Sequence, residues 1–220
     1  MITKRMLGRL ALAMATAGLM SAAAAETTIA YITNGNTNEG WTLINGGAKK
    51  AGQKAGVKFI ELAAEKGELS KQLAIVEDMI TRKVNAIAIA PVDSAGIAPA
   101  INKALAAGIK VVAVDTGISG AKITSYVATD NIKAAMVQGD WTAEQVKDGD
   151  TVIYITGDLG QSTGQERKKG FLDGLNAKRK NVKVVEVSTT WDQTMAQNGV
   201  ETAMRANPGV KVIACAWDGG

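Results

Sequence analysis

Short apolar runs alternate with longer amphipathic segments along most of the chain. Four runs rich in β-branched residues are predicted to be strands: residues 28–33, 57–62, 86–90 and 109–114. Their nearly continuous apolar character is typical of a parallel sheet covered on both faces. Three intervening segments with helical periodicity are predicted to be helices: residues 41–55, 68–83 and 95–107. This order predicts right-handed βαβ units in a doubly wound α/β sheet.

The same order begins again after a predicted helix over residues 132–146. Strands are expected at residues 151–156, 182–187 and 210–216, and helices at residues 164–177 and 194–206. The fold class is therefore α/β, with an N-terminal lobe over residues 26–129 and a C-terminal lobe over residues 130–220. Residues 127–131 are the expected crossing between them. The second lobe is expected to be incomplete, because the chain ends directly after a strand and the sheet would keep an open edge.

The first 25 residues have the order of a secretory signal peptide. Lys4, Arg5 and Arg9 precede an apolar run over residues 10–20, and small residues lead to a cleavage site at Ala25. The run is shorter than the roughly 20 residues that span a bilayer, although a membrane anchor is the alternative. Cleavage would leave 25 − 3 = 22 Lys and Arg against 21 Asp and Glu, a net charge of +1. We expect a periplasmic protein without the clustered basic surface of a nucleic-acid partner.

The residue types exclude several kinds of chemistry. The chain has no histidine, which rules out Ser-His-Asp and Cys-His catalysis and every imidazole metal site. Neither a metal nor a cofactor is expected. Cys215 is the single cysteine and lies in an apolar run, where inert core is the expectation. The Gly-rich turn over residues 35–41 has Trp41 where a phosphate-binding loop needs lysine, so nucleotide binding is not expected.

Ligands of open α/β sheets bind beyond the carboxyl ends of the strands, so the residues that follow each strand are the candidates. Asp115 directly follows a predicted strand and begins an Asp-Thr-Gly sequence. An aspartic protease needs a second carboxylate and a mostly β fold, and neither is expected here. The carboxylate of Asp115 is instead predicted to accept hydrogen bonds from the hydroxyl groups of a polyol. A loop aspartate that only fixes its own backbone is the alternative.

Three of the four tryptophans, Trp41, Trp191 and Trp217, also fall just past predicted strands. An indole face packs against the C–H face of a sugar and excludes water, although each ring could instead plug the edge of a lobe. Trp141 lies within a predicted helix and is assigned to packing. Arg167 lies on the first turn of another, where it is either a fixed donor at the cleft or part of a solvated basic face.

In their order along the chain, five segments resemble the periplasmic sugar-binding proteins of the ribose-binding type, the receptors of ABC importers. The segments are residues 28–56, 86–117, 126–131, 164–175 and 211–218, and the resemblance covers essentially all of residues 27–220. It implies a type I periplasmic binding protein fold, in which two lobes joined by a hinge close on a sugar. It also implies a monomer that catalyses no reaction and hands its ligand to a membrane permease.

The resemblance also implies roles for individual residues. Asp115 is similar to the aspartate that grips sugar hydroxyls from the first lobe, Arg167 to the arginine of the second lobe, and Trp191 to an aromatic wall. The loop after the first strand, where the family uses polar and aromatic contacts, is matched by Thr33, Asn38 and Trp41.

Two of the ligand-binding candidates depart from the family. Thr116 stands where ribose binders carry arginine, and Trp217 stands where the family commonly has asparagine. These departures favour a smaller or less polar polyol over ribose.

Three other functions are considered, and one of them is excluded. A sugar-responsive repressor would carry a DNA-binding helix-turn-helix where this chain has the expected signal peptide. An extracytoplasmic carbohydrate-active enzyme would need two carboxylates about 5 to 9 Å apart across an acetal, and Asp115 and Asp218 on the two lobes are the candidates. A sugar-sensing receptor for chemotaxis or signalling remains the other alternative.

Overall fold

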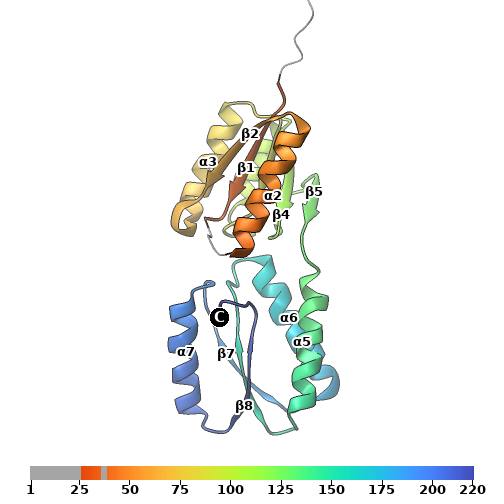
Figure 1. The fold of residues 1–220 in the computed structure, drawn as a ribbon, viewed down its shortest axis with the longest axis vertical. Helices are drawn as coiled ribbons and strands as arrows, with labels where there is room; N and C mark the ends of the chain where they lie inside the picture. Colours follow the sequence, from red (N-terminus) through yellow and green to blue (C-terminus); the bar gives the residue numbers. More distant parts are fainter. Residues whose placement is uncertain (1–25, 36–38) are drawn as a thin grey trace, which may run out of the picture.

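The computed structural model describes residues 26–35 and 39–220, which form two α/β lobes that follow one another along the long axis of the molecule (Figure 1). The expected signal peptide, residues 1–25, and Asn38 lie outside the described residues. None of the helices in the described part of the chain is long and apolar enough to cross a membrane.

The first lobe contains a parallel sheet with the strand order β2-β1-β3-β4-β5. Its strands are β1 (Thr28–Thr33), β2 (Lys58–Ala63), β3 (Ala86–Ile89), β4 (Lys110–Val114) and β5 (Ser125–Val127). Its helices are α2 (Glu39–Ala55), the short η1 (Glu65–Gly67), α3 (Leu69–Thr81) and α4 (Ala98–Ala106). Residues of α3 and α4, among them Val76 and Ile101, form one buried cluster with Ile32, Ile87 and Val111 of the strands. These two helices therefore cover one face of the sheet.

The other face of the first sheet is covered by α2. Tyr31 and Phe59 stack on this face with ring centroids 5.9 Å apart, and the Tyr31 hydroxyl donates to Oδ1 of Asn45 in α2 over 2.8 Å. Gly52 of α2 lies against the Phe59 ring so closely that a Cβ there would be 2.8 Å from it. The helix therefore needs glycine at this position in order to approach the sheet.

The second lobe contains a parallel sheet with the strand order β7-β6-β8. The strands are β6 (Thr151–Ile155), β7 (Lys183–Val187) and β8 (Val210–Cys215), and the helices are α5 (Asn131–Gln145), α6 (Ser162–Lys178) and α7 (Gln193–Ala206). Alternate residues of β6 enter separate clusters: Tyr154 packs with Phe171 of α6, and Ile155 with Ala196 of α7. The sheet is thus covered by α5 and α6 on one face and by α7 on the other (Figure 1).

The α/β class, the parallel sheets and the order of elements agree with the sequence analysis, and two predictions need correction. The expected crossing over residues 127–131 overlaps a short strand that was missed, because Val127 ends β5 and pairs with Val114 of β4. Residues 128–130 then lead directly into α5. Trp141 of α5 is 57% exposed, so its assignment to packing was wrong.

Candidate ligand-binding cavity between the lobes

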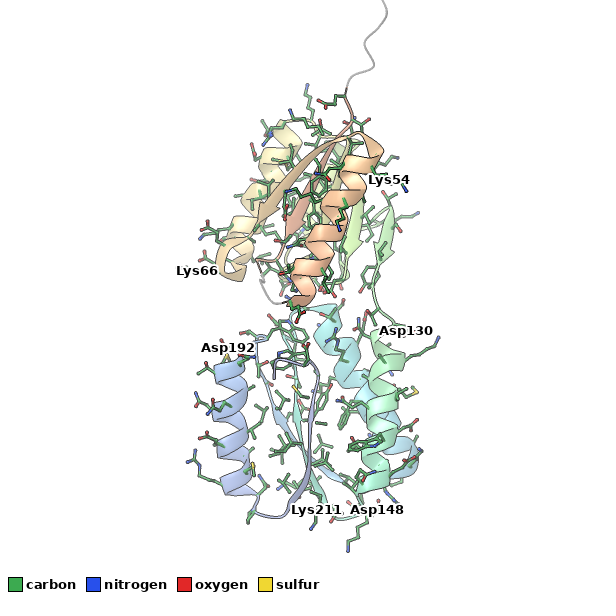
Figure 2. The ribbon with its side chains drawn as sticks, in the orientation of Figure 1. Lys54, Lys66, Asp130, Asp148, Asp192 and Lys211 are labelled. Carbon is green, nitrogen blue, oxygen red and sulfur yellow. The ribbon has the colours of Figure 1, made fainter. Side chains whose placement is uncertain are left out.

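A cavity of about 220 Å³ lies where loops of the two lobes meet. The walls combine indole rings with charged and amide groups, and they are formed by Asn34, Gly40, Trp41, Ile44, Asp115, Gln161, Thr163, Arg167, Trp191, Trp217 and Asp218. Five of the predicted residues are brought together here, namely Trp41, Asp115, Arg167, Trp191 and Trp217. Figure 2 shows Asp130 and Asp192, which cap α5 and α7, at the end of the second lobe that faces the first lobe. The positive ends of these two helix dipoles therefore point towards the first lobe.

Asp115 sits on a strained turn at the end of β4. Its φ is +62°, a backbone conformation that residues other than glycine rarely adopt. The Thr116 amide donates back to the Val114 carbonyl over 2.6 Å. The missed strand β5 holds this turn. The Asp115 amide donates to the Val127 carbonyl over 2.9 Å, and the Tyr126 hydroxyl donates to the Asp115 carbonyl over 2.9 Å. Both backbone polar groups of Asp115, the amide and the carbonyl, are thus held by β5.

Burial raises the pKa of the Asp115 carboxyl above its ordinary value of 3.8, because a desolvated carboxylate is disfavoured. A hydrogen bond from the Thr116 hydroxyl to Oδ2, 3.0 Å long, and the positive charge of Arg167 act in the opposite direction. Asp115 is therefore a partly buried acceptor whose ionised form gains from every further donor.

Thr116 and Thr33 do not line the cavity. Thr116 is fully buried behind Asp115, to which it donates, and its Oγ1 lies 3.4 Å from Oγ1 of Thr163 in the second lobe. Thr33 is 3% exposed, and its Oγ1 accepts a 3.4 Å hydrogen bond from the Gly35 amide. Thr33 thus shapes the loop after β1, while its neighbour Asn34 lines the cavity.

Arg167 projects from α6 into the cavity and is clamped by two hydrogen bonds. Its Nε donates to Oδ1 of Asn131 and its Nη1 to the Ala216 carbonyl, both over 2.9 Å. The guanidinium carbon also lies 5.5 Å from the centroid of Trp191, which is a cation–π arrangement. Lys168 instead pairs with Glu186 over 2.7 Å. Of the two interpretations drawn from the sequence, the fixed donor at the cleft is the one that the geometry supports.

Trp191 and Trp217 form an aromatic corner on the second lobe. Their ring centroids are 5.5 Å apart and the planes are nearly perpendicular at 82°. Trp191 also has a positive φ of +64°, and its Nε1 donates to Oε1 of Gln161 over 2.9 Å. A Cβ at Gly157 would overlap the Trp191 ring, so glycine is required beneath it. Trp41 of α2, which is 7% exposed, supplies an indole from the first lobe.

Five lining residues were not predicted individually: Asn34, Gly40, Ile44, Gln161 and Thr163. All except Ile44 lie in a loop that directly follows a strand or at the start of the next helix. The rule that ligands bind beyond the carboxyl ends of the strands therefore identifies them as a group. Gln161 carries one further signal. It occupies the N-cap position of α6, where Ser, Thr, Asp or Asn is preferred and glutamine is unusual.

A cavity between the carboxyl ends of two parallel-sheet lobes, lined from both, defines a two-lobed ligand-binding protein. The sequence model of the family described as periplasmic binding protein domain matches residues 29–220, and the chain belongs to that family.

Three relatives illustrate the likeness. The ribose import binding protein RbsB of Salmonella typhimurium is 29% identical over 191 residues, which are 87% of this chain and 64% of that protein. The D-ribose/D-allose-binding protein of Pseudomonas aeruginosa is 33% identical over 214 residues, 90% of this chain and 66% of that protein. The ABC transporter solute binding protein from Burkholderia graminis, solved in complex with D-arabinose, has a TM-score of 0.80 at 30% identity. That match covers 88% of this chain and 66% of the other. The chain thus spans about two thirds of the length of these relatives.

Proposed function

We propose that the protein is the substrate-binding component of an ABC importer, which holds a small sugar or polyol between its lobes and delivers it to a membrane permease. The observation that carries this proposal is the composition of the cavity, where a carboxylate, a guanidinium and indole faces converge from both lobes. The chain's likeness to a ribose import binding protein and to a D-ribose/D-allose-binding protein supports it.

The cavity groups match the chemistry of a polyol. Asp115 accepts hydrogen bonds, and the guanidinium of Arg167 has five N–H groups, of which two serve Asn131 and Ala216. Neighbouring hydroxyls of a sugar can donate to the carboxylate and accept from the guanidinium at the same time. The indole faces of Trp41 and Trp191 suit the C–H faces of the ligand. Since the large ring of Trp217 takes up space in the wall, the ligand is a small or less polar polyol.

We expect binding without catalysis. Asp115 and Asp218 both line the cavity, so the carbohydrate-active enzyme is the alternative that must be tested directly. A binding protein returns its ligand intact, whereas a glycosidase would release a free reducing sugar from a glycoside incubated with the protein. The described residues contain no group of three or more acidic or cysteine side chains placed to hold a metal ion.

The setting of this function is the periplasm, where the protein acts as a monomer and meets the permease without a nucleic-acid partner. The description of its family supports the location. A sugar-sensing receptor would use the same cavity but pass its signal to a different membrane protein. Transport of the ligand into cells that carry the permease, abolished by deletion of the protein, would separate import from sensing.

The test is a titration of the protein with a panel of pentoses, hexoses and polyols, followed by tryptophan fluorescence and by thermal unfolding. Three tryptophans line the cavity, so their emission is expected to change on binding. Ligand at a hundred times its Kd would stabilise the fold by about 2.7 kcal/mol. Arg167→Ala is expected to weaken both responses, and Lys169→Ala on the same helix is the control. If no polyol gives a response and an unrelated ligand class does, the proposal is wrong.

A further inference from the structure

Gln161 occupies an unusual place at the junction of the lobes. It is the N-cap residue of α6, it is only 5% exposed, and it lines the cavity. Its side chain makes no capping hydrogen bond to the helix. A buried glutamine that leaves its own helix uncapped must satisfy its amide elsewhere, because an unpaired buried amide is unfavourable.

The amide of Gln161 bridges the two lobes through two hydrogen bonds. Its Oε1 accepts from Nε1 of Trp191 over 2.9 Å in the second lobe, and its Nε2 donates to the Val92 carbonyl over 3.1 Å in the first lobe. An indole N–H can only donate and a carbonyl can only accept, so the bridge needs a side chain that does both. Glutamine meets this need, whereas a carboxylate or an apolar group of the same length does not.

Val92, the anchor in the first lobe, is itself held from the core of that lobe. Its amide donates to Oε1 of Gln72 over 2.8 Å, and Nε2 of Gln72 donates to the Ala90 carbonyl over 2.8 Å. Gln72 is fully buried in α3. A continuous chain of hydrogen bonds therefore runs from the core of the first lobe through Gln161 to a wall of the cavity in the second.

The residues beside Gln161 reinforce the junction. The Ser162 amide, at the start of α6, donates to Oγ of Ser94 in the first lobe over 2.9 Å, and Oγ of Ser162 accepts from the Gly117 amide over 2.8 Å. The Ser94 amide donates to the Gly160 carbonyl over 3.0 Å. The first lobe thus supplies a cap for an N–H of α6 that the helix cannot pair by itself.

We infer that Gln161 is a positioning residue that couples contact between the lobes to the placement of Trp191 in the cavity wall. When the lobes are in contact, the Gln161 side-chain amide is fixed by Val92 and holds the Trp191 indole in its position in the cavity wall. When they part, the amide loses that anchor and Trp191 loses its fixed partner. If the protein binds a polyol as proposed above, the bridge slows release of the polyol, because Trp191 stays in the cavity wall while the lobes are in contact.

Three substitutions separate the two halves of the bridge. Gln161→Glu keeps an acceptor for Trp191 but cannot donate to Val92 at neutral pH, whereas Gln161→Met has a similar length and makes neither bond. Trp191→Phe keeps a ring and removes the indole donor. Gln165→Met is the control, since that glutamine lies one turn further along α6 and donates to the Leu159 carbonyl outside the cavity.

The first measurement needs no ligand. Hydrogen exchange of the tryptophan ring N–H groups is followed by NMR, and the Trp191 resonance is the one that Trp191→Phe removes. Gln161→Met is expected to speed exchange at this N–H about 3- to 10-fold, and Gln161→Glu is expected to speed it by a smaller factor, because the carboxylate still accepts from the indole but has lost its anchor on Val92. Both variants are expected to speed backbone amide exchange at Ser94 and Ser162 by a similar factor. Gln165→Met is expected to change neither.

The second measurement is the dissociation rate of the polyol that gives the largest thermal shift in the wild type. Gln161→Glu and Gln161→Met are both expected to raise it about 3- to 10-fold, with association rates within about 2-fold.

The inference is overturned if Gln161→Met leaves exchange at the Trp191 ring unchanged, or if Gln161→Glu leaves exchange at Ser94 and Ser162 unchanged. It also falls if Gln165→Met reproduces either effect, because general loosening of α6 would then be the cause. Expected exchange results in a protein that binds no polyol would support the bridge and refute the proposed function. Polyol binding with unchanged exchange in the Gln161 variants would support the proposed function and refute the bridge.

Discussion

Replacing Asp115 with asparagine is expected to stabilise the folded protein at neutral pH and to weaken binding of the polyol. The carboxylate is partly buried, and this burial raises its pKa above the ordinary value of 3.8. Asparagine has nearly the same shape without the charge. Its amide oxygen can still accept the hydrogen bond from Thr116, so the change removes mainly the cost of desolvating the ion.

The direction of the pH dependence follows from proton linkage. Because the pKa of Asp115 is higher in the folded state than in the unfolded state, the folded protein holds the proton more tightly. The protein keeps its full stability below the pKa that Asp115 has in the unfolded state. Its stability falls as the pH rises through the pKa of Asp115 in the folded state. At a pH above both pKa values, a tenfold difference in proton affinity between the folded and unfolded states lowers the free energy of unfolding by about 1.4 kcal/mol. The advantage of Asp115→Asn should therefore be small near pH 4 and larger at pH 7.

The effect on binding has the opposite sign. One carboxylate oxygen already accepts from Thr116, and the described residues contribute no further side-chain donor to the other. In asparagine one of the two positions becomes an NH₂ group, which cannot accept from a ligand hydroxyl. Losing one charge-assisted hydrogen bond costs about 1.5 to 3 kcal/mol, or roughly 10- to 150-fold in Kd.

Urea unfolding at pH 4, 5.5 and 7 and calorimetric titration with the best polyol of the panel would measure both effects. Asp78→Asn is the control for stability, since Asp78 is an exposed carboxylate of α3 that pairs with Arg82 over 3.5 Å. The reasoning would be refuted if Asp115→Asn destabilised the fold equally at all three pH values, or if its Kd equalled that of the wild type.

Two further substitutions test how the cavity walls are held. Gly157→Ala is expected to displace the Trp191 ring, to destabilise the protein by about 1 to 3 kcal/mol and to reduce the fluorescence response to the ligand, because its Cβ would overlap the indole. Gly46→Ala, on the exposed surface of α2 with nothing near its Cβ, should be neutral or slightly stabilising in the same unfolding assay. Asn131→Ala removes the acceptor for Nε of Arg167, so calorimetry should show weaker polyol binding, and an unchanged Kd would mean that this clamp is irrelevant.

The periodicity of the sequence predicted the two lobes well because buried parallel strands leave a strong apolar signal. The strand β5 left none, since Ser125–Val127 is three residues long and all three side chains are exposed. It exists because it pairs with β4 and because Tyr126 and Val127 bond to Asp115. Such a strand depends on tertiary contacts, which a local pattern does not encode.

The candidate site could be predicted by loop but not always by residue. Asp115 and Thr116 are neighbours, and the positive φ of Asp115 decides which of them faces the cavity. The residues alone left Arg167 as either a cleft donor or part of a solvated basic face, and the family resemblance favoured the cleft. Its orientation depends on Asn131, which lies 36 residues earlier in the chain and is not marked by any local pattern. The role of Gln161 depends on partners 69 and 30 residues away, and its capping position was not predicted either, because the helix was expected to begin at residue 164 and begins at Ser162.

The backbone conformations of the cavity explain why its walls need so much support. Among the described residues, four that are not glycine have a positive φ, and two of them, Asp115 and Trp191, line the cavity from opposite lobes. Each such conformation costs about 1 to 3 kcal/mol and persists only where the surroundings impose it. For Asp115 the surroundings are the hydrogen bonds from β5, and for Trp191 they are the bare backbone of Gly157 and the amide of Gln161. Because groups of the protein itself hold both conformations, binding need not supply the energy to orient either side chain, which leaves more of the binding energy for affinity.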